Sequence, residues 1–288
     1  MKNPQSRSTP QVVTTADELR RQVAVARQVG RSVGLVPTMG ALHAGHLSLV
    51  DACQAHCGVT IVTIFVNPTQ FGPHEDFAAY PRTLAADLEL LAGHGAQMVF
   101  APATASVYGA NDATAVEVGG PALPLEGQFR PGHFRGVATV VLKLFMLAQP
   151  DRAYFGRKDY QQSLVVRRMV ADLQLPIQVE VCPTVREADG LAMSSRNVYL
   201  SPEERRRATS IYESLFLAKQ LVAQGTLDAA TVLSRMQETL RAADLKVDYV
   251  ALADADTLEP VATIDRPTVA LIAARVGATR LIDNELIA

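Results

Sequence analysis

The sequence has few cysteines, little net charge and no long apolar run, and these shortages exclude several classes of protein. The formal net charge of the 288 residues is −2, so the strong basic excess typical of nucleic-acid-binding proteins is missing. No apolar stretch approaches the roughly 20 residues that a membrane-spanning helix needs. The polar segment 1–10 lacks the apolar core of a signal peptide and is expected to be a frayed tail. We therefore expect neither a nucleic-acid partner nor a membrane partner.

The three cysteines bear on the cellular compartment. An odd number does not suit a framework of paired disulfides, which indicates a reducing compartment, and the cytoplasm is the expected location. Cys53 and Cys57 are four residues apart and could share a helix face, an arrangement that also raises the question of a zinc site. Structural zinc sites usually use Cys-x-x-Cys hairpins, and no second pair exists here. We therefore expect the cysteines to be small buried apolar residues.

Strand-like and helix-like segments alternate through the first two thirds of the chain. Nearly continuous apolar strands alternating with helices indicate an α/β fold, with a Rossmann-like parallel sheet covered on both faces. In such sheets ligands bind beyond the carboxyl ends of the strands, so the loops that follow strands should carry the function. The expected strands are 33–36, 59–66, 97–101, 152–155 and 177–181, and the expected helices are 16–29, 47–56, 84–94, 136–148 and 159–173.

The pattern changes after Gly190. Ser201 is suited to cap a helix, because a proline occupies the first helical position and acidic residues occupy the first turn. We place the domain boundary between 1–187 and 188–288, with a hinge near 185–200, and expect the second part to be a smaller α+β domain. Its expected helices are 201–224 and 228–242, and its expected strands are 247–253, 269–274 and 280–286.

Two histidines stand where the first buried strand gives way to a helix. His43 and His46 flank Gly45, a few residues after the strand expected at 33–36. The first amides of a helix lack internal partners and the helix dipole favours negative charge there, so this segment can form an anion pocket. Two imidazoles would add hydrogen-bond donors to a phosphate as its charge develops. Alternatively, the histidines cap the helix or fill a polar corner of the core.

Two further loops carry polar residues with more than one interpretation. Asn67 and Gln70, just past the second strand, suit a pocket for a hydroxyl or carboxylate, but Asn and Pro could equally build a turn there. The charged run 74–76 in the same loop is expected to be a solvated surface. The glycine-rich segment 125–136 has two arginines before a helix, which suits an anionic ligand or an ordinary basic loop.

The segment after the strand at 152–155 combines several groups that suit a nucleotide. Gly156 lets backbone approach a ligand, and Lys158 supplies a point charge for phosphate. Asp159 can cap the following helix or bind magnesium, and Gln162 would share a helix face with Lys158 or Asp159. Near the expected hinge, two hydroxyls and an arginine in an irregular segment are suited to clamp a triphosphate; they are Ser194, Ser195 and Arg196.

Taken together, these segments resemble a known family. His43-Ala44-Gly45-His46 with Met193-Ser194-Ser195-Arg196 is similar to the paired HIGH and KMSKS signatures of the nucleotidyltransferase superfamily. The resemblance is closer to the pantothenate synthetase family, whose blocks appear here in the family's order. These blocks are 37–46, 65–71, 80–83, 155–162 and 186–197. One departure is Arg157, which stands where the family often has an acidic residue.

The resemblance implies a reaction and its substrates. Pantoate would be adenylated by ATP with magnesium, pyrophosphate would leave, and the amine of β-alanine would then displace AMP. Such an attack needs charge neutralisation on the phosphates rather than a protein nucleophile. The family also implies a homodimer. The rivals are another adenylyl- or cytidylyltransferase of the superfamily, which the Asn67 and Gln70 loop disfavours, and a catalytically silent nucleotide-binding module.

The resemblance also assigns roles to residues. His46 would be the general acid that assists pyrophosphate departure, with His43 and Lys158 as supporting catalytic groups. Gln70 and Gln162 would hold pantoate in a pocket that includes Asn67, with Gln70 also near β-alanine. Asp87 is the candidate magnesium ligand, although the phosphates could hold the metal instead. ATP would be framed by Met39, Gly40, Ala41, Leu42, His43, Ala44, Gly45, His46, Gly156, Arg157, Lys158, Asp159, Val185, Met193, Ser194, Ser195 and Arg196.

Overall fold

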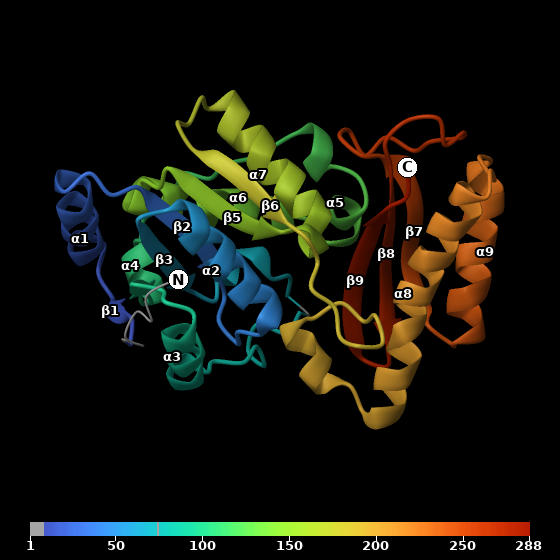
Figure 1. Ribbon diagram of the computed structural model, residues 1–288, viewed down its shortest axis with the longest axis horizontal. Coiled ribbons are helices and arrows are strands. Elements are labelled where there is room, and N and C mark those ends of the chain that lie inside the picture. Colours follow the sequence, from blue (N-terminus) through green and yellow to red (C-terminus); the bar gives the residue numbers. More distant parts are fainter. Residues whose placement is uncertain (1–8, 74) are drawn as a thin grey trace, which may run out of the picture. The chain divides into compact units, whose positions relative to one another are not determined.

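A computed structural model describes residues 9–73 and 75–288, which divide into two compact units (Figure 1). The first unit takes the chain up to Ala122 together with Glu126–Gly156 and Gln161–Cys182, and the second takes Leu123–Leu125, Arg157–Tyr160 and Pro183–Ala288. The main boundary therefore precedes the expected one at 187. The turn that carries Lys158 groups with the second unit, although the expected first domain included it. Most of the expected tail at 1–10 lies outside the described residues.

The first unit is built on a six-stranded parallel sheet in the order β1-β4-β3-β2-β5-β6. From β2 the chain builds outward through β3 and β4, and then returns to the other side of β2 for β5 and β6. Ligands bind at such a reversal, beyond the carboxyl ends of the strands, here those of β2 and β5. The strands are β1 (Gln11–Val13), β2 (Val33–Thr38), β3 (Val59–Ile64), β4 (Met98–Phe100), β5 (Arg152–Gly156) and β6 (Gln178–Cys182).

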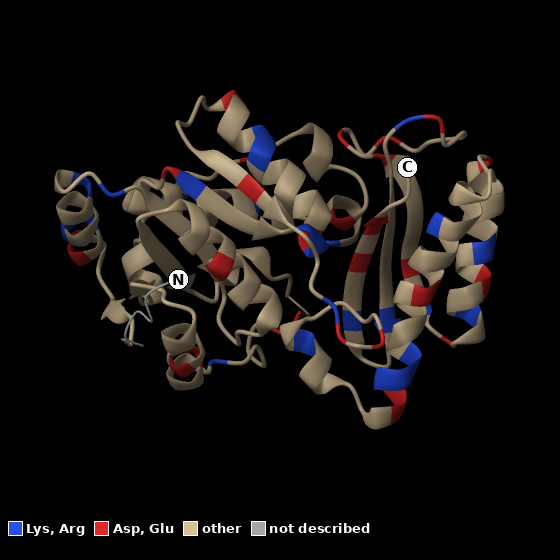
Figure 2. Ribbon diagram, viewed as in Figure 1, with Lys and Arg blue, Asp and Glu red and all other residues tan. Residues whose placement is uncertain are grey.

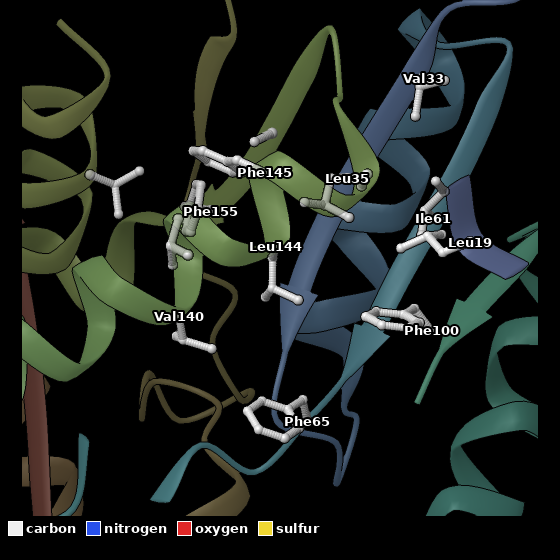
Figure 3. Packing of buried hydrophobic residues seen from close by; sticks show 14 of the residues in the cluster. Leu19, Val33, Leu35, Ile61, Phe65, Phe100, Val140, Leu144, Phe145 and Phe155 are labelled. Atoms are coloured by element: carbon white, nitrogen blue, oxygen red, sulfur yellow. The ribbon is translucent and has the colours of Figure 1, made fainter. Parts of the chain in front are cut away.

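Helices cover both faces of this sheet, as expected. Successive residues of β2 point to opposite sides, so Leu35 packs in one core cluster with Phe145 of α6 (Figure 3) and Val36 in another with Val50 of α2. The helices are α1 (Ala16–Gln28), α2 (Ala44–His56), α3 (Leu84–Gly93), α4 (Thr104–Val107), α5 (Glu126–Phe129), α6 (His133–Ala148) and α7 (Tyr160–Asp172). Short 3₁₀ turns are η1 (Pro68–Gln70), η2 (Gly120–Ala122) and η3 (Arg157–Asp159).

The second unit packs two helices against a three-stranded antiparallel sheet in the order β7-β8-β9. Its core joins Leu215 of the first helix and Met236 of the second to Ile272 of the central strand. Ser201 and Glu204 form a capping box at the first helix, with proline at its first position, as expected. The elements are η4 (Ser195–Tyr199), α8 (Pro202–Ala223), α9 (Ala229–Ala242), β7 (Lys246–Asp254), β8 (Thr268–Val276) and β9 (Thr279–Leu286).

The expected α/β class, a Rossmann-like parallel sheet followed by a smaller α+β region, is confirmed. The strand β1 was not expected, because three residues are too few to show a periodic pattern. Cys53 is buried, and burial raises the pKa of its thiol to about 12, whereas Cys57 and Cys182 are half-buried. Across residues 9–73 and 75–288, no helix combines the length and apolar character needed to cross a bilayer.

Candidate active site

The loop after β2 has an unusual backbone that one carboxylate holds in place. Gly40 and Ala41 both adopt left-handed conformations, with φ of 86° and 50°. A Cβ atom on Gly40 would lie 3.0 Å from Ile64 Cγ2, so glycine fits this position for space as well as for backbone conformation. The carboxylate of Asp87 accepts hydrogen bonds from the backbone N–H of Ala41 at 3.1 Å and of Leu42 at 2.8 Å. These bonds fix the loop that leads into α2.

This arrangement gives Asp87 a structural role, and its expected role as a magnesium ligand stays a prediction. The side chain is fully buried, and both of its oxygens also accept from Thr83 Oγ1 at 3.3 Å. Its oxygens therefore already serve the protein's own donors. Within the described part of the chain, no group of three His, Cys, Asp or Glu side chains is placed to hold a metal ion. We assign Asp87 to shaping the loop.

His43 and His46 form the capping box that begins α2. The Nδ1 of His43 accepts from Gly45 N–H at 3.1 Å, and the Nδ1 of His46 accepts from His43 N–H at 3.3 Å. Because each bond uses the Nδ1 lone pair, each neutral ring carries its proton on Nε2. The ring centroids lie 4.1 Å apart. The capping interpretation therefore holds, and it is compatible with the anion pocket, because capping fixes the tautomer in which Nε2–H can donate.

Gln70 lies beside the same loop. Its Nε2 is 3.3 Å from Met39 Sδ, which links the residues that follow β3 to those that follow β2. Its Oε1 accepts a hydrogen bond from Asn67 Nδ2 at 3.0 Å, so the orientation of the amide is fixed. The first unit thus places Gln70 beside the loop that leads to the two histidines. Gln162 is half-buried in the first turn of α7, beyond the carboxyl end of β5.

Asn67 is held inside the protein by its hydrogen bonds. Only 1% of its surface is exposed, and its Oδ1 accepts from Thr69 N–H, Thr69 Oγ1 and Tyr108 OH. Its Nδ2 donates to Gln70 Oε1 and also to the carbonyl of Gly136, the latter at 3.2 Å. The amide is therefore fully used inside the protein. Asn67 therefore positions Gln70, and its expected contact with a substrate stays a prediction.

A charged network supports Gln70 from the other side. His133 Nδ1 lies 2.9 Å from the carbonyl of Gln70, and its Nε2 lies 3.1 Å from Arg130 Nη1. Arg130 also donates to both carboxylate oxygens of Glu75, at 2.7 and 2.6 Å. Although burial opposes the change, the hydrogen bonds and charge of Arg130 lower the pKa of Glu75. This corrects the expectation of a solvated surface at 74–76 with respect to Glu75; His74 lies outside the described residues.

The sequence drew attention to the segment 125–136, but it did not indicate that Arg130 in this segment pairs with Glu75. The arginines at 125–136 suggested an anion site, whereas Arg130 already pairs with Glu75. The adjacent Gln161 was missed. Its Oε1 accepts from Glu126 N–H at 3.1 Å and its Nε2 donates to Pro121 O at 2.8 Å, so it fastens this segment to the start of α7. A buried glutamine next to an expected ligand-binding one gives no separate signal in the sequence.

The buried histidine predicts a pH dependence of stability. Burial, with the charge of Arg130, lowers the pKa of His133 to about 4. In the unfolded chain the value would be about 6.5, so between these values the unfolded state binds a proton that the folded state does not. The free energy of unfolding should therefore fall as pH decreases through this window, by roughly 3 kcal/mol from this group.

Urea unfolding at about pH 7 and pH 4.5 checks this prediction. In His133→Gln the amide can still donate to Gln70 O and accept from Arg130, but it does not titrate, so the acid loss of stability should shrink. His56→Gln, at the exposed end of α2, is the control for losing a histidine. An equal pH slope in wild type and His133→Gln would contradict the prediction.

Gly156 ends β5 in the first unit, and the other remaining predicted ATP residues lie in the second unit. Lys158 Nζ is 3.4 Å from Asp159 Oδ1. Ser194 caps η4 by accepting from Arg196 N–H at 3.3 Å. Arg157–Tyr160 follow β5 directly but group with the second unit, as does the serine-serine-arginine segment.

A parallel sheet whose strand order reverses between β2 and β5, with a helix start and two imidazoles beside that point, is typical of a nucleotide-binding α/β protein. The comparisons identify the family within this class. The chain belongs to the pantoate-beta-alanine ligase family, which it matches over residues 11–286. This is an enzyme family, and the match spans both units.

Individual relatives agree over nearly the whole chain. Pantothenate synthetase from Moorella thermoacetica is 55% identical over 275 residues, covering 95% of this chain and 97% of the relative. The crystal structure of pantothenate synthetase from Thermus thermophilus matches with a TM-score of 0.92 and 46% identity, covering 96% and 99% of the two chains. Pantoate-beta-alanine ligase from Francisella tularensis, complexed with beta-gamma ATP and beta-alanine, matches with a TM-score of 0.81, 32% identity and coverage of 96% and 97%.

Proposed function

We propose that this protein joins pantoate to β-alanine in an ATP-dependent ligation that releases AMP and pyrophosphate. The observation that carries the proposal is the helix start of α2, where two neutral imidazoles have their tautomers set by capping bonds beside Gln70. Family membership over residues 11–286 and the relatives named above support the choice of substrates. The reaction would proceed through pantoyl adenylate.

In the first step a carboxylate oxygen of pantoate attacks the α-phosphorus of ATP, and the bond from that phosphorus to the bridging oxygen breaks. Pyrophosphate leaves with that bonding electron pair. His46 assists by donating its Nε2–H to the phosphate oxygens, with His43 beside it. We infer donation rather than complete transfer of the proton, because a neutral ring that lost it would become an anion. Lys158 and Arg196 would contribute positive charge, and Ser194 and Ser195 hydroxyl donors.

In the second step the amine nitrogen of β-alanine attacks the carbonyl carbon of the adenylate. The bond from that carbon to the AMP oxygen breaks, AMP leaves with that electron pair, and the nitrogen loses a proton to solvent as the amide forms. Gln70 and Gln162 would hold pantoate during both steps. Gln70 is suited to this task because Asn67 and His133 fix its side chain and its backbone.

The setting of the reaction is also part of the proposal. We infer a cytoplasmic enzyme that acts as a homodimer, from the cysteine content and from the family. ATP would be bound with Mg²⁺. The described residues provide no carboxylate set suited to the ion, and Asp87 serves backbone amides, so the phosphates of the nucleotide would hold it.

Release of pyrophosphate separates this function from its rivals. With ATP and pantoate but no β-alanine, the protein should release pyrophosphate, and adding β-alanine should produce AMP and pantothenate. A nucleotidyltransferase would instead retain the nucleotide in its product, and a silent binding module would release nothing. Either outcome would overturn the proposal. Omitting pantoate is the control that excludes simple ATP hydrolysis.

The close packing of α6 against η1 provides a test of how Gln70 is placed. A Cβ atom on Gly136 would lie 2.3 Å from Thr69 O and 2.7 Å from Gln70 Cα, and neither backbone atom can move alone. Gly136→Ala should therefore displace η1 and lower kcat/KM for pantoate by about 10- to 100-fold. Gly93→Ala is the matched helical control, because apart from its chain neighbours and the backbone of its own helix no atom of the described residues lies within 4 Å of its added Cβ. Equal kinetics for the two variants would contradict this role for Gly136.

A further inference from the structure

In the second unit, one strand contacts both basic segments that the proposed function assigns to ATP. Strand β9 has acidic residues near its end (Figure 2), and Asp283 and Asn284 are both almost completely buried there. Asn284 reaches the turn η3, which holds Lys158. Asp283 reaches Arg186, at the start of the segment that holds Ser194, Ser195 and Arg196. Asp283 and Asn284 are adjacent in sequence, whereas the two segments that they bond are far apart in sequence.

Asn284 holds η3 by its backbone. Its Nδ2 donates to the carbonyl of Arg157 at 2.9 Å and to that of Lys158 at 2.8 Å. Both amide hydrogens are thus used on one turn, whereas its buried Oδ1 makes no hydrogen bond within the described part of the protein. The hydrogen bonds of the Asn284 side chain are therefore those that its amide group donates to η3. Because the bonds go to backbone, they set the direction from which the Lys158 side chain emerges.

Asp283 holds the other segment through a paired contact. Arg186 Nη1 donates to Asp283 Oδ2 at 2.6 Å, and Arg186 Nη2 donates to Asp283 Oδ1 at 3.2 Å. Nη1 also donates to the carbonyl of Gly190 at 3.1 Å, and the guanidinium lies 4.5 Å from the ring centre of Tyr212. The Arg186 guanidinium therefore stabilises the loop that ends at Gly190 and at the same time binds to β9 through Asp283.

The loop that Arg186 braces leads directly to the predicted ATP hydroxyls. Val185 O accepts from Met193 N–H at 3.0 Å, and Glu187 N–H donates to Leu191 O at 2.8 Å, so 185–193 folds back on itself as a paired arm. Ser194 follows at once. The position of the arm on β9 consequently determines where Ser194 begins η4.

We propose that Asp283 and Asn284 are positioning residues, which hold the Lys158 turn and the 185–193 arm on one strand so that their ATP-binding groups keep a fixed spacing. This inference rests on the proposed function for its consequence and on the hydrogen bonds of β9 for its geometry. Neither residue needs to touch a substrate. The pair acts through Lys158 on one side and through Ser194, Ser195 and Arg196 on the other.

Hydrogen exchange resolved by peptide tests the geometry independently of activity. Asn284→Asp keeps the size of the side chain but replaces its two donors by acceptors, so exchange should accelerate at 157–160 and not at 185–193. Asp283→Asn should have the opposite pattern. Ser214→Ala is the control, because it removes one buried bond, to Met236 O, between α8 and α9. A rate at 157–160 equal in Asn284→Asp and Ser214→Ala would overturn the proposal.

Turnover tests the consequence. Asn284→Asp should lower kcat/KM for ATP by about 10- to 100-fold, and Ser214→Ala should leave it near wild type. In a Lys158→Ala background the Asn284 substitution should add little, because the turn then carries no ammonium to misplace. Independent, multiplying losses would overturn the positioning role. A wild-type protein without pantoate-dependent pyrophosphate release would overturn the proposed function, and the exchange result alone would then decide whether β9 holds the turn.

Discussion

His46→Ala is expected to abolish pantoate-dependent pyrophosphate release while the protein stays folded. The substitution removes the Nε2–H donor at the start of α2, and losing a donor to developing charge typically slows a reaction by about 10²- to 10³-fold. It also removes the capping acceptor for His43 N–H, which should cost about 1 kcal/mol of stability. Single-turnover measurement of pyrophosphate release, with circular dichroism as the folding check, tests the prediction.

A second variant separates the two tasks of this imidazole. Glutamate is a common residue at the third helical position of a capping box, so His46→Glu should keep the cap acceptor and the stability of α2. It cannot donate a hydrogen bond to a phosphate, and its charge would repel one. We expect a folded protein with an activity loss at least as large as that of His46→Ala. Near-normal release by either variant would contradict the role given to His46.

Asp87→Ala is expected to cause the largest loss of stability among the loop substitutions. It leaves the N–H groups of Ala41 and Leu42 without their carboxylate acceptor in a buried place. Loss of one such acceptor costs about 1–3 kcal/mol, so loss of both should lower the free energy of unfolding by about 2–6 kcal/mol. Activity should fall as well, because this loop leads into the histidine pair.

The matched control is an exposed carboxylate with one polar partner. Asp51→Ala removes the exposed partner of His94 and should cost less than about 1 kcal/mol. Asp87→Asn keeps one acceptor oxygen and should give an intermediate loss. Urea denaturation of the three variants checks the ranking. If Asp87→Ala and Asp51→Ala lost equal stability, the structural role of Asp87 would be wrong. A loss of magnesium binding with unchanged stability would restore its assignment to the metal.

The features visible in the sequence are those that depend on neighbours along the chain. The strand at β2, the helix start at His43 and the capping box at Ser201 all arise within a few residues, where periodicity and capping rules apply. The parallel sheet also follows, since strand and helix patterns alternate. Helix α2 nevertheless begins three positions earlier than its apolar pattern indicated, at Ala44, because His43 itself supplies the cap.

Several predicted site residues have structural partners that are distant in sequence. Asn67 looks like a ligand-binding amide, but its Nδ2 is used by Gly136, and Asp87 looks like a metal ligand until Leu42 is found to donate to it. The turn at Lys158 follows a parallel strand, yet Asn284 ties it to the other unit's sheet. A polar residue at a strand end has the same appearance in sequence whether its partner is a substrate or a backbone amide.

The contact between Asp87 and the loop after β2 makes the start of α3 a thermodynamic partner of the site. Opening the first turn of α3 would withdraw the carboxylate from Ala41 and Leu42, so the open form would have a loosened histidine loop. A ligand that prefers the ordered loop must then disfavour that opening, and by linkage the two effects are equal in free energy. Substitutions in α3 can thereby change affinity at the histidine pair.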